Sequence, residues 1–171
     1  MITDLEKRVV ALEERVQILD ILHLEGEYSR SWDFGSGEEW ASLFTEDGVF
    51  EMRSTVSVAP LPAGQGAKIE GRKALAEFRA AFDLGWFFLH QMHLPSCRIN
   101  GETAEAVMFF ECPIKASDTE GRAAISREVG VYKVQYRRTA EGWKIARRVE
   151  EAVLRDSMFY FGRPESKLSL A

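Results

Sequence analysis

The sequence predicts an α+β fold, with helices in the first half of the chain and an antiparallel sheet in the second. Apolar residues recur at helical spacing over the first thirty or so residues. From residue 88 onward, long apolar segments alternate with short turn sequences that are typical of hairpins. Helices followed by a run of hairpin-connected strands predict one sheet that folds against the helices.

The first predicted element is a long helix from Thr3 to about Trp32, a stretch with no proline and one glycine. Thr3 followed by Glu6 forms a capping-box pattern, and Gly35 is a stop signal. A heptad seam follows the first half of this helix: Leu5, Val9, Leu12, Val16 and Leu19. We expect the seam to pack on another subunit or across the helix's own domain.

Two further helices and one strand are predicted before the sheet. A helix over residues 37–44 has Ser36 as its cap and is followed by a turn at 45–48. Residues 49–53 indicate a short strand. The loop from Arg53 to Ala67 contains two prolines and is long enough to act as a lid. A third helix is predicted over residues 70–84.

The predicted sheet is built from four long segments, at 88–100, 102–115, 125–138 and 142–154. Asn100-Gly101, residues 118–121 and Glu141-Gly142 are the turns between them. The length of 171 residues fits one domain over residues 1–171, with residues 1–15 as a helical extension and 155–171 as a tail.

Composition and charge exclude several functions. The net charge of −5 argues against nucleic acid as a partner, because phosphate binding requires concentrated Lys and Arg. The basic residues Arg137, Arg138, Lys144, Arg147 and Arg148 are expected on a solvated face, with one arginine turned inward. No apolar run is long enough to span a membrane, and the chain starts without a secretory leader, so a cytoplasmic location is expected. Cys97 and Cys112 are expected as reduced core residues.

Two of the three histidines lie in Leu89-His90-Gln91-Met92-His93. On a strand, residues three apart point to opposite faces, so at most one of them enters a pocket. A metal site is therefore not expected. No phosphate loop, dinucleotide fingerprint or nucleophile elbow accompanies them, and no cofactor is predicted.

Asp33 is a candidate partner for the inward histidine. A carboxylate in the last turn of a helix meets the negative end of the helix dipole and needs compensation. Tyr28, Trp32 and Phe34 surround it with aromatic surface, which favours the wall of a cavity. An Asp-His pair orients a proton acceptor, and a tyrosine can assist a leaving oxygen, so the pattern indicates elimination chemistry.

The chain resembles the SnoaL-like branch of the nuclear transport factor 2 superfamily over nearly its whole length. Four stretches carry the resemblance: residues 27–33, residues 40–50, residues 90–99 and Gly142-Trp143-Lys144-Ile145. The first and third are similar to the Asp-His dyad enzymes of that branch, namely bile acid 7-alpha-dehydratase, scytalone dehydratase and hexachlorocyclohexane dehydrochlorinase. The resemblance implies a cone-shaped fold with a curved, mixed and mostly antiparallel sheet on three helices. It also implies a homo-oligomer, a trimer or a dimer.

The resemblance also implies catalytic residues. Tyr28 and Asp33 have the spacing of the bile acid enzyme, and His93, followed by Leu94-Pro95, matches the dyad histidine better than His90 does. Arg148 matches a pocket arginine of the dehydrochlorinase. In this hypothesis His93 accepts a proton, Asp33 orients it, Tyr28 assists the leaving oxygen and Arg148 stabilises negative charge.

The predicted function is a cofactor-free lyase acting on an apolar, ring-containing, hydroxylated small molecule. Dehydration and retro-aldol carbon–carbon cleavage, such as deformylation of an aromatic dimer, remain open. The aromatic residues expected around the substrate are Trp32, Phe50, Trp86, Phe87, Phe88, Phe110 and Tyr132, all but Phe87 as substrate-binding residues. Two alternatives are a non-catalytic beta subunit of a ring-hydroxylating dioxygenase and a small-molecule-binding module.

Overall fold

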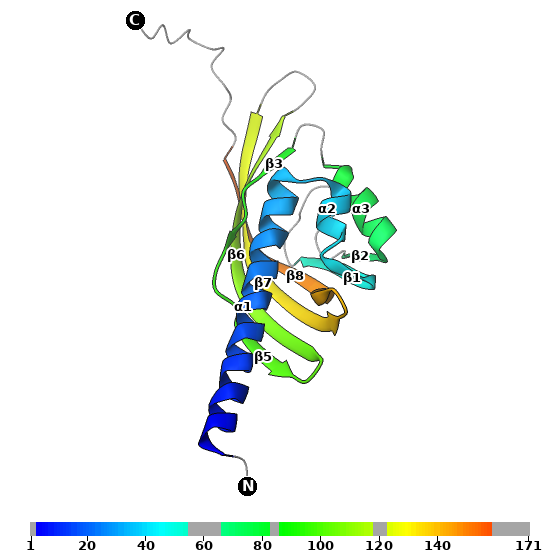
Figure 1. Ribbon diagram of the computed structural model, residues 1–171. Helices are drawn as coiled ribbons and strands as arrows, with labels where there is room; N and C mark the ends of the chain where they lie inside the picture. Colours follow the sequence, from blue (N-terminus) through cyan, green and yellow to red (C-terminus); the bar gives the residue numbers. More distant parts are fainter. Residues whose placement is uncertain (1–2, 55–65, 83–85, 118–122, 159–171) are drawn as a thin grey trace, which may run out of the picture.

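The computed structural model describes residues 3–54, 66–82, 86–117 and 123–158. In chain order, the elements are α1 (Asp4–Phe34), α2 (Gly37–Ala41), β1 (Phe44–Ser54), β2 (Ala67–Glu70), α3 (Arg72–Ala80), β3 (Trp86–Phe88), β4 (Gln91–Met92), β5 (Ser96–Asn100), β6 (Thr103–Ser117), β7 (Ala123–Thr139) and β8 (Gly142–Met158). The predicted α+β class is confirmed, because these helices and strands form one sheet with helices against it (Figure 1).

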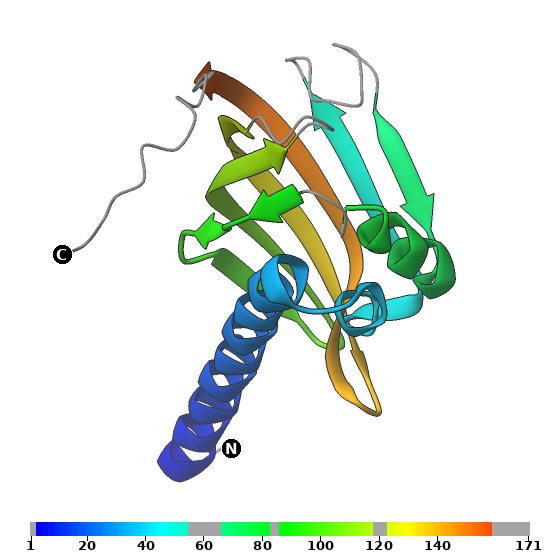
Figure 2. The ribbon, with the colours of Figure 1, turned by 90° about the horizontal axis from the view of Figure 1, so that it is seen from above.

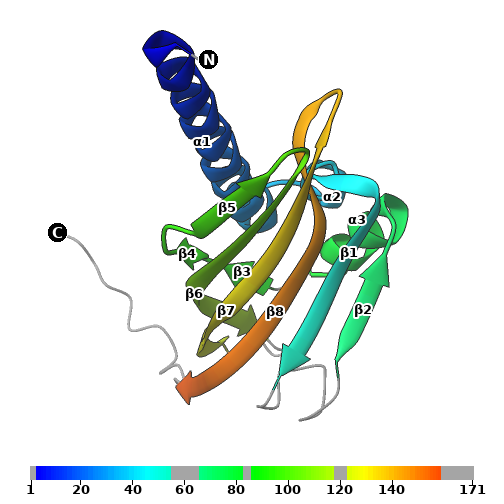
Figure 3. The same ribbon diagram turned by 90° about the horizontal axis from the view of Figure 1, so that it is seen from below.

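One mixed sheet contains all of these strands. Its order is β2-β1-β8-β7-β6-β3, and β4 and β5 also pair with β6. Only the β1–β8 pairing is parallel among the described strands; the others are antiparallel. The long strands β6, β7 and β8 curve strongly, and the helices lie on the concave side (Figures 2 and 3). The mostly antiparallel curved sheet is therefore as predicted.

Helix α1 begins as the sequence predicts. The Thr3 hydroxyl accepts from the Glu6 backbone N–H, and the Glu6 carboxylate accepts from the Thr3 N–H, which completes the capping box. Residues 3–16 are exposed, and this half of the helix projects past the sheet (Figure 1). The second half packs on the core through Ile21, Leu24, Tyr28 and Trp32.

The C-terminal end of α1 is held by α3. Arg79, buried on α3, donates to the backbone carbonyl oxygens of Trp32 at 2.7 Å and Gly35 at 3.3 Å. These carbonyls have no partner within the helix, and a cation there also complements the helix dipole. This contact fixes the end of α1, with Trp32 and Asp33, against α3.

Several element boundaries differ from the prediction, and α2 and α3 are both shorter than predicted. Residues 45–48 do not end a helix in a free turn but belong to β1, where the register with β8 shifts between Phe44 and Val49. Strand β2 follows the loop predicted over residues 53–67, and residues 55–65 of that lid lie outside the described residues. The strand predicted over 88–100 is broken into β3, β4 and β5.

The described helices include none that is long and apolar enough to cross a membrane.

Candidate active site

Asp33 and His90 form the central contact of the site. The His90 Nδ1 lies 2.6 Å from Asp33 Oδ1, and the His90 backbone N–H donates to Asp33 Oδ2 at 2.7 Å. Both side chains are almost fully buried, at 6% and 3% exposure. With a carboxylate at Nδ1, the imidazole donates its N–H there, and Nε2, which makes no hydrogen bond among the described residues, can accept a proton. Asp33 thus fixes both the ring and the backbone of His90.

The dyad histidine is His90, which corrects the prediction of His93. Trp86 and Phe88 on β3 are part-buried and buried, whereas Phe87 and Leu89 are exposed, so even-numbered side chains point inward. His90 continues the inward series between β3 and β4. His93 lies three residues on, is exposed, and contacts the exposed Phe109 on the outer face of β6. One of the two histidines enters the site, as strand alternation predicts, but it is His90 and not His93.

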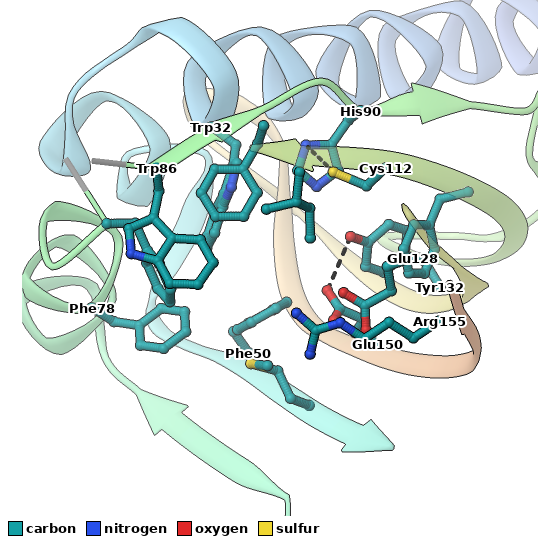
Figure 4. Close-up of a pocket in the computed structure, with 15 residues that line it drawn as sticks. Trp32, Phe50, Phe78, Trp86, His90, Cys112, Glu128, Tyr132, Glu150 and Arg155 are labelled. Atoms are coloured by element: carbon teal, nitrogen blue, oxygen red, sulfur yellow. Dashed lines mark hydrogen bonds between the residues drawn. The ribbon is translucent and has the colours of Figure 1, made fainter. Parts of the chain in front are cut away.

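A pocket opens beside His90 between the concave face of the sheet and the helices (Figure 4). Its volume is about 50 Å³, which corresponds to a few water molecules. Lining side chains come from α1, α3, the five strands β1, β3, β6, β7 and β8, and the connections after α3 and β3. They are Trp32, Phe50, Met52, Phe78, Phe82, Trp86, Phe88, His90, Phe110, Cys112, Ile114, Glu128, Tyr132, Glu150 and Arg155. A ring-containing ligand therefore requires neighbouring aromatic side chains to move apart.

All six residues predicted to bind substrate lie along this pocket: Trp32, Phe50, Trp86, Phe88, Phe110 and Tyr132. Phe82, from the end of α3, stands edge-on between Trp86 and Phe88. Phe110 stacks on Tyr132 with ring centroids 4.2 Å apart. Phe87, by contrast, is 48% exposed and contacts Phe34 outside the pocket.

Arg148 is enclosed behind the pocket and does not line it. Its guanidinium donates to both carboxylate oxygens of Glu25, at 2.8 and 3.1 Å from Nη1. It is sandwiched between the rings of Tyr28 and Tyr132, 3.5 and 4.0 Å from their centroids. The predicted substrate-facing role of Arg148 is therefore corrected: its charge is neutralised internally, and it is the one arginine of its cluster that is fully buried.

Tyr28 shares this layer behind the pocket. It is 1% exposed, faces Arg148 and stands edge-on to His90 at a centroid distance of 6.3 Å. It does not line the pocket, and burial keeps the pKa of its hydroxyl well above the ordinary value. The structure therefore places Tyr28 against His90 and Tyr132 behind the pocket, which corrects the predicted position of Tyr28 beside the substrate.

Two glutamates that line the pocket, Glu128 and Glu150, were not predicted as site residues from the sequence. Glu150 on β8 accepts a hydrogen bond from the Tyr132 hydroxyl at 3.0 Å. Glu128 lies on β7 on the same face as Tyr132, two inward-facing positions before it. Burial, reinforced by Glu128, raises the pKa of Glu150 to about 8. Burial also raises the pKa of Glu128, against an opposing effect of Arg155.

A sequence signal for Glu128 exists in the alternation of buried and exposed residues along β7. Glu128 shares the parity of Gly130, Tyr132, Val134 and Tyr136, which are buried. A glutamate on the buried parity of a strand indicates a paired or functional carboxyl. The signal for Glu150 is obscured, because the register of β7 and β8 also shifts between Gln135 and Tyr136, and the inward positions of β8 change from odd numbers at Trp143 and Ile145 to even numbers from Arg148 onward.

Within the described residues, no group of three or more His, Cys, Asp and Glu side chains is arranged to hold a metal ion. Both cysteines are free thiols. Cys112 is buried in the pocket wall, with its sulfur 3.8 Å from the His90 Nδ1, and burial raises the pKa of its thiol.

The fold and pocket define a class of small α+β proteins in which a curved sheet and three helices enclose one apolar site. Residues 10–149 match the SnoaL-like domain model, so the chain belongs to the SnoaL-like family. A solved structure described as NTF2-like with a cystatin-like fold, from Novosphingobium aromaticivorans, shares the fold at a TM-score of 0.55 and 22% identity over 90% of each chain. The predicted family and NTF2-like fold are confirmed. No curated protein matches this sequence with statistical significance.

Similar solved structures differ in what they are named for. A type 2 hexachlorocyclohexane dehydrochlorinase has 13% identity and a TM-score of 0.65, covering 92% of this chain and 98% of its own. A presumed scytalone dehydratase from N. aromaticivorans has 23% identity and a TM-score of 0.63, covering 92% and 97%. The beta subunit of a presumed aromatic-ring-hydroxylating dioxygenase from the same organism has 15% identity and a TM-score of 0.63, covering 82% and 92%. At these identities the likeness shows the fold alone.

Proposed function

We propose that the protein is a cofactor-independent lyase that acts on an apolar, ring-containing, hydroxylated small molecule. One observation carries the proposal: a buried histidine, held by Asp33 at Nδ1, lines an aromatic pocket, and its Nε2 makes no hydrogen bond among the described residues. Family membership and the named dehydratase and dehydrochlorinase among the fold neighbours support it.

The dyad supplies a base. Asp33 holds the Nδ1–H of His90 and stabilises the positive charge that develops when Nε2 accepts a proton. In dehydration, that proton comes from carbon and a hydroxyl leaves from the neighbouring carbon. In carbon–carbon cleavage, the proton comes from a hydroxyl and an aldehyde departs. The apolar walls favour a flat ring and exclude water from the reacting atoms.

The test compares His90→Ala with His93→Ala in the purified protein, on a panel of hydroxylated steroids and hydroxylated aromatic dimers. Products are followed by mass spectrometry for loss of water and by an aldehyde reagent for carbon–carbon cleavage. We expect His90→Ala to lower kcat by about 10²- to 10⁴-fold, the usual contribution of a positioned base. His93→Ala is the matched control, because His93 is an exposed histidine three residues away, and it is expected to keep wild-type kcat.

Full activity in His90→Ala contradicts the base role. A wild-type protein that binds panel members without converting any of them contradicts the lyase proposal and favours a binding module. A protein that gains function only with a dioxygenase alpha subunit favours the beta-subunit alternative, which the fold likeness to such a subunit also permits.

A further inference from the structure

The pocket contains a second group of titratable side chains, apart from the dyad. Glu128 and Tyr132 come from β7, and Glu150 and Arg155 come from the neighbouring β8. Tyr132 is paired with Glu150 and Glu128 with Arg155 in the register of the two strands. Figure 4 shows these four side chains together on one side of the pocket, with His90 on another and the tryptophans and Phe78 on a third.

Small residues open the space around the two glutamates. Gly130 and Ala152 occupy the register position between the Tyr132–Glu150 pair and the Glu128–Arg155 pair. A methyl group on Gly130 would lie 2.6 Å from the ring of Phe110. The glycine therefore lets Phe110 lie flat against Tyr132, and the only side chain at the register position between the two carboxyls is the methyl group of Ala152.

Glu128 is the part of this group that points to a ligand. It is 5% exposed, it lines the pocket, and its Oε1 makes no hydrogen bond among the described residues. A buried acceptor without a partner is costly, and a bound hydroxyl would satisfy it. Two carboxyls close together in an apolar wall cannot both ionise readily, so one of them retains a proton that it can donate.

We propose that the Glu128–Glu150 pair is the proton donor of the reaction and that it contacts the substrate group that receives the proton, on the side of the pocket away from His90. This inference rests on the proposed lyase function and extends it, because it adds the acid to the base. Tyr132 is a positioning residue in this scheme, since its hydroxyl holds Glu150 at 3.0 Å.

The two groups together balance the protons of an elimination. His90 Nε2 takes the proton from carbon, the C–H electrons form the double bond, and the C–O bond breaks. The leaving oxygen takes the carboxyl proton and departs as water. In the carbon–carbon route, His90 takes the hydroxyl proton, the C–C bond breaks to give the aldehyde, and the carboxyl proton goes to the carbon that keeps the electron pair. Proton exchange with solvent then restores both groups.

The donor should work only while the pair is protonated. The titratable and charged groups around Glu150 include Tyr28 on α1, Glu128, Tyr132, Arg148, Arg155, Cys112 and His90. Of these, Glu128 and the apolar wall favour the protonated form of Glu150, while Tyr132 and Arg148 oppose it. The pKa of Glu150 near 8 therefore predicts that kcat falls as the pH rises through about 8.

The first measurement follows the glutamate carboxyl carbons by ¹³C NMR in the full chain and needs no substrate. We expect one carboxyl of the wild type to titrate near pH 8 and to titrate at lower pH in Glu128→Gln, where the neighbouring charge is gone. Titration of both carboxyls near the ordinary value of about 4.3 overturns the inference.

The second measurement is turnover of the panel by Glu150→Gln. Glutamine keeps the shape and the hydrogen bond from Tyr132 but cannot donate an acidic proton. We expect kcat to fall by about 10²-fold, with loss of the alkaline limb of the pH profile. Glu151→Gln is the matched control, because Glu151 is the next residue on β8 and pairs with Lys133 outside the pocket.

Wild-type kcat with an unchanged pH profile in Glu150→Gln overturns the donor while leaving the His90 base intact. A wild type that converts nothing in the panel instead contradicts the lyase function, and the donor role falls with it even if the pair titrates near pH 8. The two failures are therefore distinguishable.

Discussion

At the scale of single residues, the site has two layers with different tasks. His90 and the two glutamates face the pocket, whereas Tyr28, Glu25 and Arg148 lie behind it. The buried Glu25 also accepts from the Tyr136 hydroxyl at 2.7 Å, so each charge in the second layer has a partner. Arg148 stacks on both Tyr28 and Tyr132. The second layer therefore supports the rings that contact His90 and Glu150 in the first layer.

Arg148→Met is expected to destabilise the fold by about 3–5 kcal/mol, since it leaves Glu25 charged and unpaired in the core. Urea unfolding followed by circular dichroism measures the change. The double variant Glu25→Gln with Arg148→Met removes both charges and should recover part of the loss. If Arg148→Met instead keeps wild-type stability and loses only kcat, then the arginine acts on substrate after all.

At the scale of elements, a single glycine on β7 controls the shape of the pocket floor. In Gly130→Ala the new methyl group meets the Phe110 ring at 2.6 Å and the backbone oxygen of Glu151. We expect a loss of about 1–3 kcal/mol, the usual cost of overpacking, because a backbone atom cannot move aside as a side chain can. The midpoint of urea unfolding checks this.

Gly101→Ala is the comparison for the backbone alone. Gly101 has open space around its Cβ position but a positive φ of 59°, so any loss there comes from strain and not from a clash. If Gly130→Ala is no more destabilising than Gly101→Ala, then the floor of the pocket is more adaptable than its packing indicates.

The elements show how far the sequence alone could lead. Periodicity and capping located α1, and turn chemistry located β6, β7 and β8, because those signals are local. The choice between His90 and His93 depended on the parity of a short irregular segment, and family spacing favoured the wrong one. Alternation from Phe88 would have pointed to His90.

The pairing of distant residues was beyond the reach of sequence reasoning. Nothing local shows that Glu25 on α1 contacts Arg148 on β8, or that Glu128 and Glu150 line the same pocket from two strands. Arg148 looked like a pocket residue because its family position is one, and only the observed Glu25 contact assigns it elsewhere. The aromatic lining was predictable because large apolar residues on the buried parity must face either the core or the cavity.

At the scale of the whole molecule, the first half of α1 carries an apolar stripe that no other element in the described part of the chain covers. Leu5, Leu12, Val16 and Leu19 are each more than half exposed, and their heptad spacing suits a second helix of the same kind. We predict that this stripe contributes to a homo-oligomer. Sedimentation velocity on Leu12→Lys should show a smaller assembly than the wild type at equal concentration.

Arg8→Lys serves as the control for that measurement, because it alters a side chain near the stripe without placing a new charge on it. A wild-type protein that sediments as a monomer at micromolar concentration contradicts the prediction, as does an unchanged assembly in Leu12→Lys.

The continuity of α1 links two distant parts of the molecule. The helix runs without a break from the exposed stripe to Asp33, a length of roughly 40 Å at the ordinary rise per residue. Because a continuous helix is stiff, a small tilt imposed at its N-terminal end displaces its C-terminal end. Asp33, whose carboxylate orients His90, lies at the C-terminal end of this helix, where Arg79 bonds the neighbouring Trp32 carbonyl. Substitutions along the stripe should therefore change kcat of the proposed reaction as well as the oligomeric state.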